Sequence, residues 1–113
     1  MSKPTSDVFQ IESEIKWEDQ SGGITRQVFG YNNQIMMAKA RFEKGAIGTL
    51  HSHPHTQVAF VHGGVFEVTI GDEKRILKDG DGFYVDSNVV HGVVCLEAGT
   101  LVDAFTPMRE DFI

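Results

Sequence analysis

The chain has 113 residues and a formal net charge of −6, from 16 acidic and 10 basic side chains. This length suits a single domain, 1–113, and the acidic balance argues against nucleic acid as a partner, because phosphate binding needs clustered Lys and Arg. No apolar run approaches the roughly 20 residues of a membrane span, and the polar start of the chain lacks the pattern of a signal peptide. The single cysteine, Cys95, excludes an internal disulfide. We therefore expect one cytoplasmic domain, with no nucleic-acid or membrane partner and a frayed segment at 1–7.

Short segments of alternating apolar and polar residues, separated by turn residues, predict strands along most of the chain. They cover 24–31, 35–42, 49–53, 57–62, 65–70, 73–77, 83–85, 91–96 and 100–106. A loop is predicted at 45–48, and Gly71-Asp72 predicts a two-residue hairpin turn. Pro107 ends the last strand because it cannot donate to a ladder, and the tail at 108–113 has room for one helical turn.

Short strands at spacings of roughly 8–12 residues predict an all-β sandwich or barrel. The 12 glycines fit the many turns that such a fold needs. A parallel α/β sheet is excluded, because its crossovers need helices and no segment of sufficient length carries a helical period.

Three of the five histidines lie within five residues of one another. On a strand, His51 and His53 point to the same face, and Gln57 joins them if the chain stays extended or bends once. Two imidazoles on one strand face, with a third from a distant strand, would form a metal site, and neutral imidazole suits several transition metals. The alternative is a set of exposed polar histidines on a loop.

The spacing around these histidines favours the metal site. The intervals between the successive residues Gly45, His51, His53, Gln57 and Gly64 are six, two, four and seven positions. This pattern resembles the first motif of the cupin superfamily, in which Glu usually stands at the position of Gln57.

A second stretch has the spacing of the second cupin motif. Gly80 is followed by Asp86, Asn88 and His91 at the intervals of that motif, although Pro and Gly usually stand at the positions of Asp86 and Asn88. The last position of the motif, usually Asn, is Cys95. Together the two motifs resemble the cupin family over about half the chain, which implies a single jelly-roll β-barrel, also called a double-stranded β-helix.

The cupin resemblance implies one divalent transition metal, Ni, Mn, Fe or Zn, held by four inward-facing side chains: His51, His53, Gln57 and His91. With Gln57 in place of Glu, the ligands cancel none of the metal charge, so the ion stays more electrophilic and prefers anionic oxygen ligands. The alternative is that Gln57 is a lost ligand and that the site holds no metal. His55 and His62 match no ligand position, and we expect them at the rim or on the surface.

The last predicted strand places one acid, Asp103, in the apolar run 101–105. A buried carboxylate needs a partner or a raised pKa, and Arg109, just past Pro107, is within reach. The functional interpretation makes Asp103 a general acid or base, Phe105 an aromatic wall and Arg109 a carboxylate clamp. The alternative is a structural ion pair between Asp103 and Arg109 that closes the end of the barrel.

A narrower resemblance covers nearly the whole chain, in the segments 17–18, 36–39, 42–45, 51–55, 65–70, 90–93 and 105–112. In these the chain resembles the pectin-degradation cupins of the KdgF type. That family acts on 4,5-unsaturated uronate monosaccharides, which lyases release from pectin or alginate, and promotes their conversion to the linear 4-deoxy-5-keto sugar acid. The departures are Thr56, where an acid is common, and Asp86, where Pro is common.

This resemblance implies a metal-dependent enzyme, a ring-opening lyase or isomerase with a small sugar acid as its substrate. The family's functional residues match the four ligand positions together with Asp103, Phe105 and Arg109. On this interpretation the metal acts as a Lewis acid, Arg109 binds the carboxylate, and Asp103 moves a proton as the enol ether becomes a ketone.

Two other functions stay open. A metal-dependent cupin dioxygenase is disfavoured because such sites generally carry Glu at the place of Gln57, and because Asp103 would be unexplained. A non-catalytic sugar-acid-binding cupin is compatible with the same residues.

We also expect a homodimer, because small single-cupin barrels usually pair and edge strands need covering. The apolar N-terminal residues Val8, Phe9 and Ile11 are the candidate for exchange with a neighbour.

Overall fold

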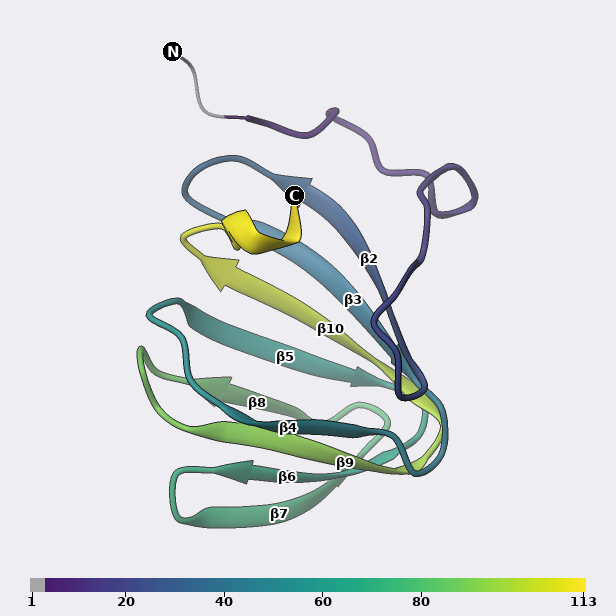
Figure 1. Ribbon diagram of the computed structural model, residues 1–113, viewed down its shortest axis with the longest axis vertical. Coiled ribbons are helices and arrows are strands. Elements are labelled where there is room, and N and C mark those ends of the chain that lie inside the picture. Colours follow the sequence, from purple (N-terminus) through teal and green to yellow (C-terminus); the bar gives the residue numbers. More distant parts are fainter. Residues whose placement is uncertain (1–3) are drawn as a thin grey trace.

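The computed structural model describes residues 4–113, which form ten strands and two single-turn 3₁₀ helices (Figure 1). In chain order these are η1 (Glu12–Glu14), β1 (Glu18–Asp19), β2 (Ile24–Tyr31), β3 (Met36–Phe42), β4 (Ile47–His51), β5 (Thr56–His62), β6 (Val65–Ile70), β7 (Glu73–Lys78), β8 (Gly82–Val85), β9 (His91–Glu97), β10 (Gly99–Thr106) and η2 (Glu110–Phe112). In the described part of the chain, no helix has the length and apolar character needed to cross a bilayer.

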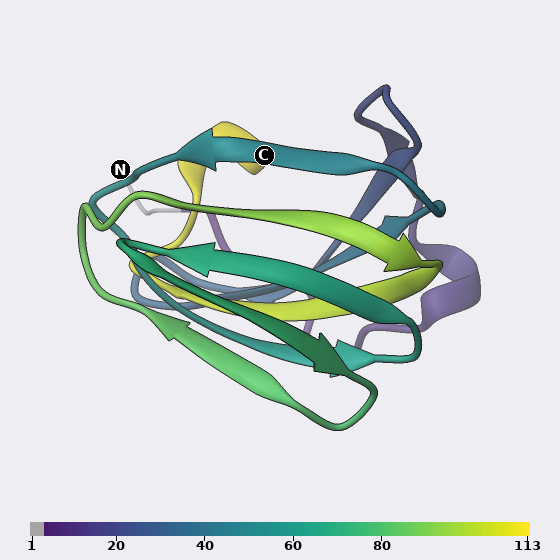
Figure 2. The same cartoon turned by 90° about the horizontal axis from the view of Figure 1, so that it is seen from below.

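The strands form two antiparallel sheets that face each other (Figures 1 and 2). One sheet has the order β1-β2-β3-β10-β5-β8, and the other has the order β4-β9-β6-β7. Strands distant in sequence are neighbours in both sheets, as in a jelly roll, which confirms the predicted all-β class.

Burial alternates along the strands because successive side chains point to opposite faces. In β5 the side chains of Gln57, Ala59 and Val61 are buried between the sheets, whereas Phe60 and His62 face outward and are exposed. A polar residue at an inward position, such as Gln57, therefore points into the space between the two sheets.

The apolar core fills one part of that space. Phe42 and Phe66 meet edge to face, with ring centroids 5.3 Å apart, and Cys95 is buried beside them with its thiol donating to the Glu97 carbonyl at 3.1 Å. Cys95 thus belongs to the core, and burial raises the pKa of its thiol. The buried core residues are Phe42, Ala46, Val61, Phe66, Val68, Val93, Cys95 and Leu101.

Most predicted strands have bounds within one or two residues of those observed. The predicted loop at 45–48 is wrong in its last two residues, which belong to a strand. Strand β4 already begins at Ile47, and Gly48 pairs with Val93 of β9. A Cβ at Gly48 would lie 3.1 Å from Val93 Cγ2, so the glycine serves a close approach between strands, not a turn. The two-residue strand β1 was not predicted, because its residues are exposed and it depends on pairing with β2.

The N-terminal segment is tied to β2 where the structure describes it. Residues 1–3 of the predicted frayed segment lie outside the described residues. Ser6 donates its backbone N–H to the Tyr31 carbonyl, and its hydroxyl accepts from the Tyr31 N–H, both at 2.9 Å. Ser6 thus contacts β2 within the predicted frayed segment, and the fraying itself stays a prediction. Val8 and Phe9, the proposed exchange segment, are exposed, and the homodimer stays a prediction.

The turn between β5 and β6 generates a stability prediction. Gly63 and Gly64 both have positive φ, but a Cβ at Gly64 would lie 2.5 Å from the Glu97 carbonyl oxygen, whereas a Cβ at Gly63 would meet open space. We expect Gly63→Ala to lower the free energy of unfolding by about 1–2 kcal/mol, the cost of left-handed backbone, and Gly64→Ala to lower it by at least about 3 kcal/mol. Denaturant titration of both variants measures this. Equal losses would show that the backbone overlap is relieved without cost.

Candidate metal centre and active site

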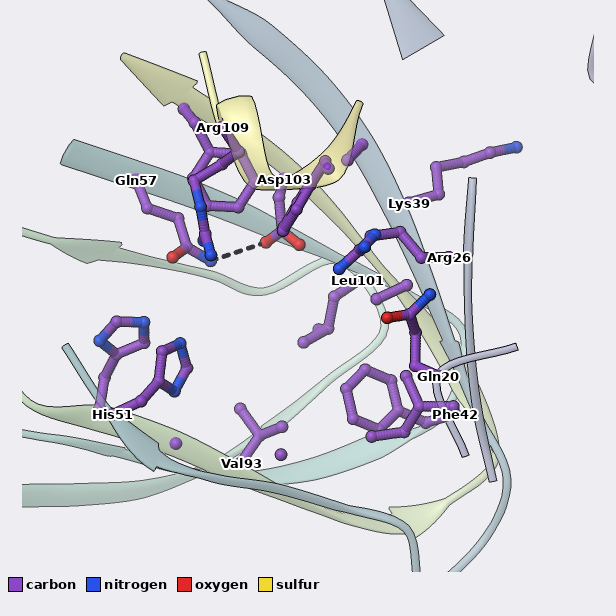
Figure 3. Close-up of a pocket in the computed structure, with 18 of the residues that line it drawn as sticks. Gln20, Arg26, Lys39, Phe42, His51, Gln57, Val93, Leu101, Asp103 and Arg109 are labelled. Carbon is purple, nitrogen blue, oxygen red and sulfur yellow. Dashed lines mark hydrogen bonds between the residues drawn. The ribbon is translucent and has the colours of Figure 1, made fainter. Parts of the chain in front are cut away.

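A cavity of about 220 Å³ opens between the two sheets and ends on the core residues Phe42, Val93 and Leu101. Its polar lining comes from both sheets and from the C-terminal tail (Figure 3). The polar and charged side chains in this lining are Gln20, Arg26, Lys39, His51, Gln57, His91, Asp103 and Arg109.

Three histidines converge at one side of this cavity. His51 at the end of β4 is the register partner of His91 at the start of β9, and His53 follows in the next loop. Their ligand atoms all lie within 4.8 Å of one another. The structure therefore brings together the three histidines that the sequence motifs selected, in a position to bind a metal ion.

The backbone fixes each imidazole so that the same nitrogen is free. Every Nδ1 lies 2.8–3.0 Å from a carbonyl oxygen: His51 from that of Thr49, His53 from that of His55, and His91 from that of Val89. A neutral imidazole that donates from Nδ1 carries its lone pair on Nε2. Backbone carbonyls in this role orient metal-ligating histidines.

The free nitrogens have the character of unused ligands. His91 Nε2 is buried and has no hydrogen-bond partner, which is costly unless something else occupies that position. Burial also lowers the pKa of His53 and of His91, so both rings are neutral at neutral pH. The neutral ring is the form that binds metals.

Gln57 supplies a fourth lone pair. Its Nε2 donates to Asp103 Oδ1 at 2.9 Å, the bond dashed in Figure 3, and this turns its Oε1 toward His53 Nε2, 3.1 Å away. A neutral His53 ring has one N–H, so it cannot donate both to the His55 carbonyl and to Gln57 Oε1. In the tautomer that donates from Nδ1, Nε2 and Oε1 are two facing acceptors, and a cation between them would relieve their repulsion. Three imidazole nitrogens and one amide oxygen therefore fit a divalent transition metal.

Asp103 is buried on β10 at the edge of this group. Burial raises the pKa of its carboxyl to about 7, against opposing effects of the Gln57 hydrogen bond and the Arg109 charge. A carboxyl with this pKa holds a proton about half of the time at neutral pH. It can therefore both accept and donate one.

The structure corrects the expected pairing of Asp103 with Arg109. Arg109 forms a two-bonded ion pair with Asp111, from Nε to Oδ1 at 3.0 Å and from Nη2 to Oδ2 at 2.8 Å. Arg109 pairs with Asp111 because the two residues are only two positions apart, and the η2 turn folds the Asp111 carboxylate back toward the Arg109 guanidinium. The Arg109 guanidinium also lies 5.1 Å from the centre of the Phe105 ring and lines the cavity.

Phe105 lies where an aromatic wall was expected. Its side chain is buried, lines the cavity and meets the His53 ring edge to face at 5.8 Å. His55 lies beside His53, with ring centroids 5.5 Å apart, and His62 is exposed on the outer face of β5. Neither His55 nor His62 belongs to the three converging histidines.

Sequence reasoning missed one cavity cation, Arg26 on β2. Lys39 on β3 also borders the cavity, but its ammonium points away from it (Figure 3) and forms an ion pair with Glu12. The available signal was the alternation of β2, which places Ile24 and Arg26 on the same face, and both line the cavity. A basic residue at an inward position of a strand is unusual, which makes this alternation a usable signal.

Comparison with known proteins agrees with the fold and the site. Residues 38–104 match the family model of the Cupin domain, and the chain belongs to the cupin family. Within that family it is similar to the pectin degradation protein KdgF of Dickeya dadantii (strain 3937), with 48% identity over 91% of this chain and 96% of that protein. The predicted resemblance to KdgF is thereby confirmed.

Two solved structures extend the comparison. KdgF from Halomonas sp. is 36% identical, with a TM-score of 0.91 over 96% of this chain and 100% of that one. An RmlC-like cupin from Shewanella frigidimarina is 41% identical, with a TM-score of 0.95 over 96% of this chain and 98% of that one. Both matches therefore extend over nearly the whole chain.

The converging lone pairs generate a prediction about metal binding. Wild-type protein titrated with Ni²⁺ should bind one equivalent, and His91→Ala should weaken binding by more than about 100-fold, because it removes a buried ligand nitrogen. Calorimetry and elemental analysis after dialysis measure both. His62→Ala, which removes an exposed histidine, should bind as the wild type does. Equal binding by wild type and His91→Ala would place the metal elsewhere.

The pKa of Asp103 generates a prediction about stability in metal-free protein. The folded pKa of about 7 lies above the ordinary value of 3.8, so the folded state holds this proton more tightly than the unfolded chain. The stabilisation is fully present below about pH 4, declines as pH rises to 7, and is lost above. At about 1.4 kcal/mol per pKa unit, it amounts to at most about 4 kcal/mol.

Asp103→Asn removes this titration. The stability of wild type minus that of Asp103→Asn, measured by denaturant titration in the presence of chelator, should therefore fall between pH 4 and pH 8. The same difference taken with Asp72→Asn, in an exposed turn, should stay flat. A flat difference for Asp103→Asn would show that its carboxyl titrates normally.

Proposed function

We propose that this protein is a metal-dependent cupin enzyme that converts 4,5-unsaturated uronate monosaccharides into linear 4-deoxy-5-keto sugar acids. The observation that carries the proposal is a buried acid with a pKa of about 7, hydrogen-bonded to the amide that faces the histidines. The similarity to two KdgF proteins, one of them named for pectin degradation, supports the substrate class.

The cavity suits a small anionic sugar. Its volume of about 220 Å³ suits a single small molecule and not a polymer. Arg26 and Arg109 line it, so a ligand inside it meets positive charge although the whole chain has a net charge of −6. A sugar acid in this cavity would meet cations in spite of the acidic composition.

The metal would be held by His51, His53, His91 and Gln57, and when bound it would supply Lewis-acid polarisation of a substrate oxygen. All four of these side chains are neutral, so they leave the full charge of the ion for the substrate. The hydrogen bond from Gln57 to Asp103 keeps the amide oxygen directed at the histidines.

The reaction is a rearrangement in which no atom is gained or lost. A proton leaves the anomeric hydroxyl, the bond from C1 to the ring oxygen breaks, and a proton is added at C4, so that C1 becomes an aldehyde and C5 a ketone. Asp103 is the group in the cavity suited to take and return this proton, because its carboxyl is buried, is held by the Gln57 amide and has a raised pKa. Phe105 walls the cavity beside it and excludes water.

Arg109 contributes positive charge at the same end of the cavity. Its pairing with Asp111 and its contact with the Phe112 ring, 4.3 Å from guanidinium to centroid, hold it in one place. One edge of the guanidinium is occupied by Asp111, and the other edge stays available for a substrate oxygen.

Turnover is tested with purified, metal-loaded protein and 4,5-unsaturated galacturonate, following the loss of alkene absorbance in the ultraviolet. Wild type should accelerate this loss, and Asp103→Asn should reduce the rate by about 10²–10⁴-fold, because it cannot transfer a proton. Asp72→Asn is the matched control and should leave the rate unchanged.

The other outcomes separate the alternative functions. Loss of alkene no faster than the spontaneous rate, with metal restored, would contradict the proposal. Oxygen consumption would then indicate a dioxygenase, and thermal stabilisation by the uronate without turnover would indicate a binding protein. An unchanged rate in Asp103→Asn would make Asp103 structural.

A further inference from the structure

Arg26 is the cavity cation that no sequence motif selected. It lies on β2 in the six-stranded sheet, is half-buried, and lines the cavity. In Figure 3 its guanidinium points into the cavity from the side opposite His51, with Asp103 between them and Gln20 nearby. The guanidinium carbon lies 3.6 Å from the centre of the Phe112 ring, so stacking holds the group in place and leaves its hydrogen-bonding edges free.

Arg26 differs from the other two cations beside the cavity in its ion pairing. Lys39 is paired with Glu12, and Arg109 is paired with Asp111. None of the side-chain hydrogen bonds and ion pairs among residues 4–113 uses the Arg26 guanidinium. Arg26 therefore has no carboxylate within ion-pair distance in the described residues, and only the more distant charges of Asp111 and Glu18 act on it.

Removing a charged group from water raises its free energy, and a ligand of opposite charge can offset this by pairing with the group. Burial disfavours the charged form of Arg26 and lowers its pKa, although a guanidinium stays protonated in proteins. A carboxylate that enters the cavity would supply the missing counter-charge and can bind a guanidinium through two parallel hydrogen bonds. The proposed substrate carries one carboxylate, on C5 next to the carbon that receives the proton.

We propose that Arg26 binds the carboxylate of the substrate and is the residue that selects a free uronic acid over its ester. This inference rests on the proposed function, and it moves the main carboxylate contact from Arg109 to Arg26. Figure 3 shows Asp103 between Arg26 and His51, so a substrate with its carboxylate at Arg26 and its sugar oxygens toward the histidines would place its reacting carbons beside Asp103.

The experiment compares 4,5-unsaturated galacturonate with its methyl ester, which has the same reacting carbons but no charge. Arg26→Gln should lower kcat/KM for the acid by about 10–100-fold, mostly through KM, and should change kcat/KM for the ester by less than about threefold. Arg26→Lys, which keeps the charge without the planar fork, should fall between wild type and Arg26→Gln. Arg75→Gln, on the exposed face of β7, removes the same charge and should leave the acid preference unchanged.

A merely structural role gives a different result. If Arg26 only supports Phe112 and the tail, Arg26→Gln lowers the rates for acid and ester alike and lowers the melting temperature, and the proposal is overturned. Arg26→Lys, whose chain still packs on the ring, keeps the test valid should Arg26→Gln fold poorly. Equal rates for acid and ester in the wild type would also overturn it.

Binding without turnover separates this inference from the proposed function. If the wild type converts neither compound, calorimetry with saturated galacturonate and its methyl ester still tests Arg26. Tighter binding of the acid that is lost in Arg26→Gln would support the assignment even though the proposed reaction had failed. Equal affinity for acid and ester, or no binding of either, would overturn the assignment as well.

Discussion

The hydrogen bond from the Gln57 amide to the Asp103 carboxylate decides how the centre of this protein is organised. It uses the amide nitrogen, so the amide oxygen must face the histidines. The same bond gives the buried carboxylate of Asp103 its donor, without which the burial cost would be greater. One side chain thus joins the metal-binding group to the acid, and a glutamate at position 57 could do so only if one of the two carboxyl groups kept a proton.

The residues linked by these contacts come from both sheets. Gln57 and Asp103 come from neighbouring strands of the six-stranded sheet, and His51 and His91 come from paired strands of the other. The cavity between them is closed on one side by apolar core residues and bordered elsewhere by cations. An acidic protein can in this way present a positive interior, because the charges that set its net value lie mostly on the outside.

The sequence allowed the strands and the converging histidines to be predicted, because alternation and motif spacing are local properties. It did not allow the partner of Arg109 to be predicted, since Asp111 reaches it only through the η2 turn. The inward position of Arg26 was readable from alternation, but its lack of a counter-charge depends on where distant carboxylates lie. The hydrogen bond between Gln57 and Asp103, 46 residues apart, depends on the pairing of β5 with β10.

The most direct test of the central claim, that Asp103 delivers a proton within this cavity, is the stereochemistry of proton addition at C4. Conversion of the unsaturated uronate in D₂O, followed by NMR early in the reaction, shows which of the two C4 positions receives deuterium. An acid fixed on one wall of the cavity predicts a single stereoisomer from the wild-type enzyme. An equal mixture of both stereoisomers, as expected for proton addition in free solution, would contradict the account.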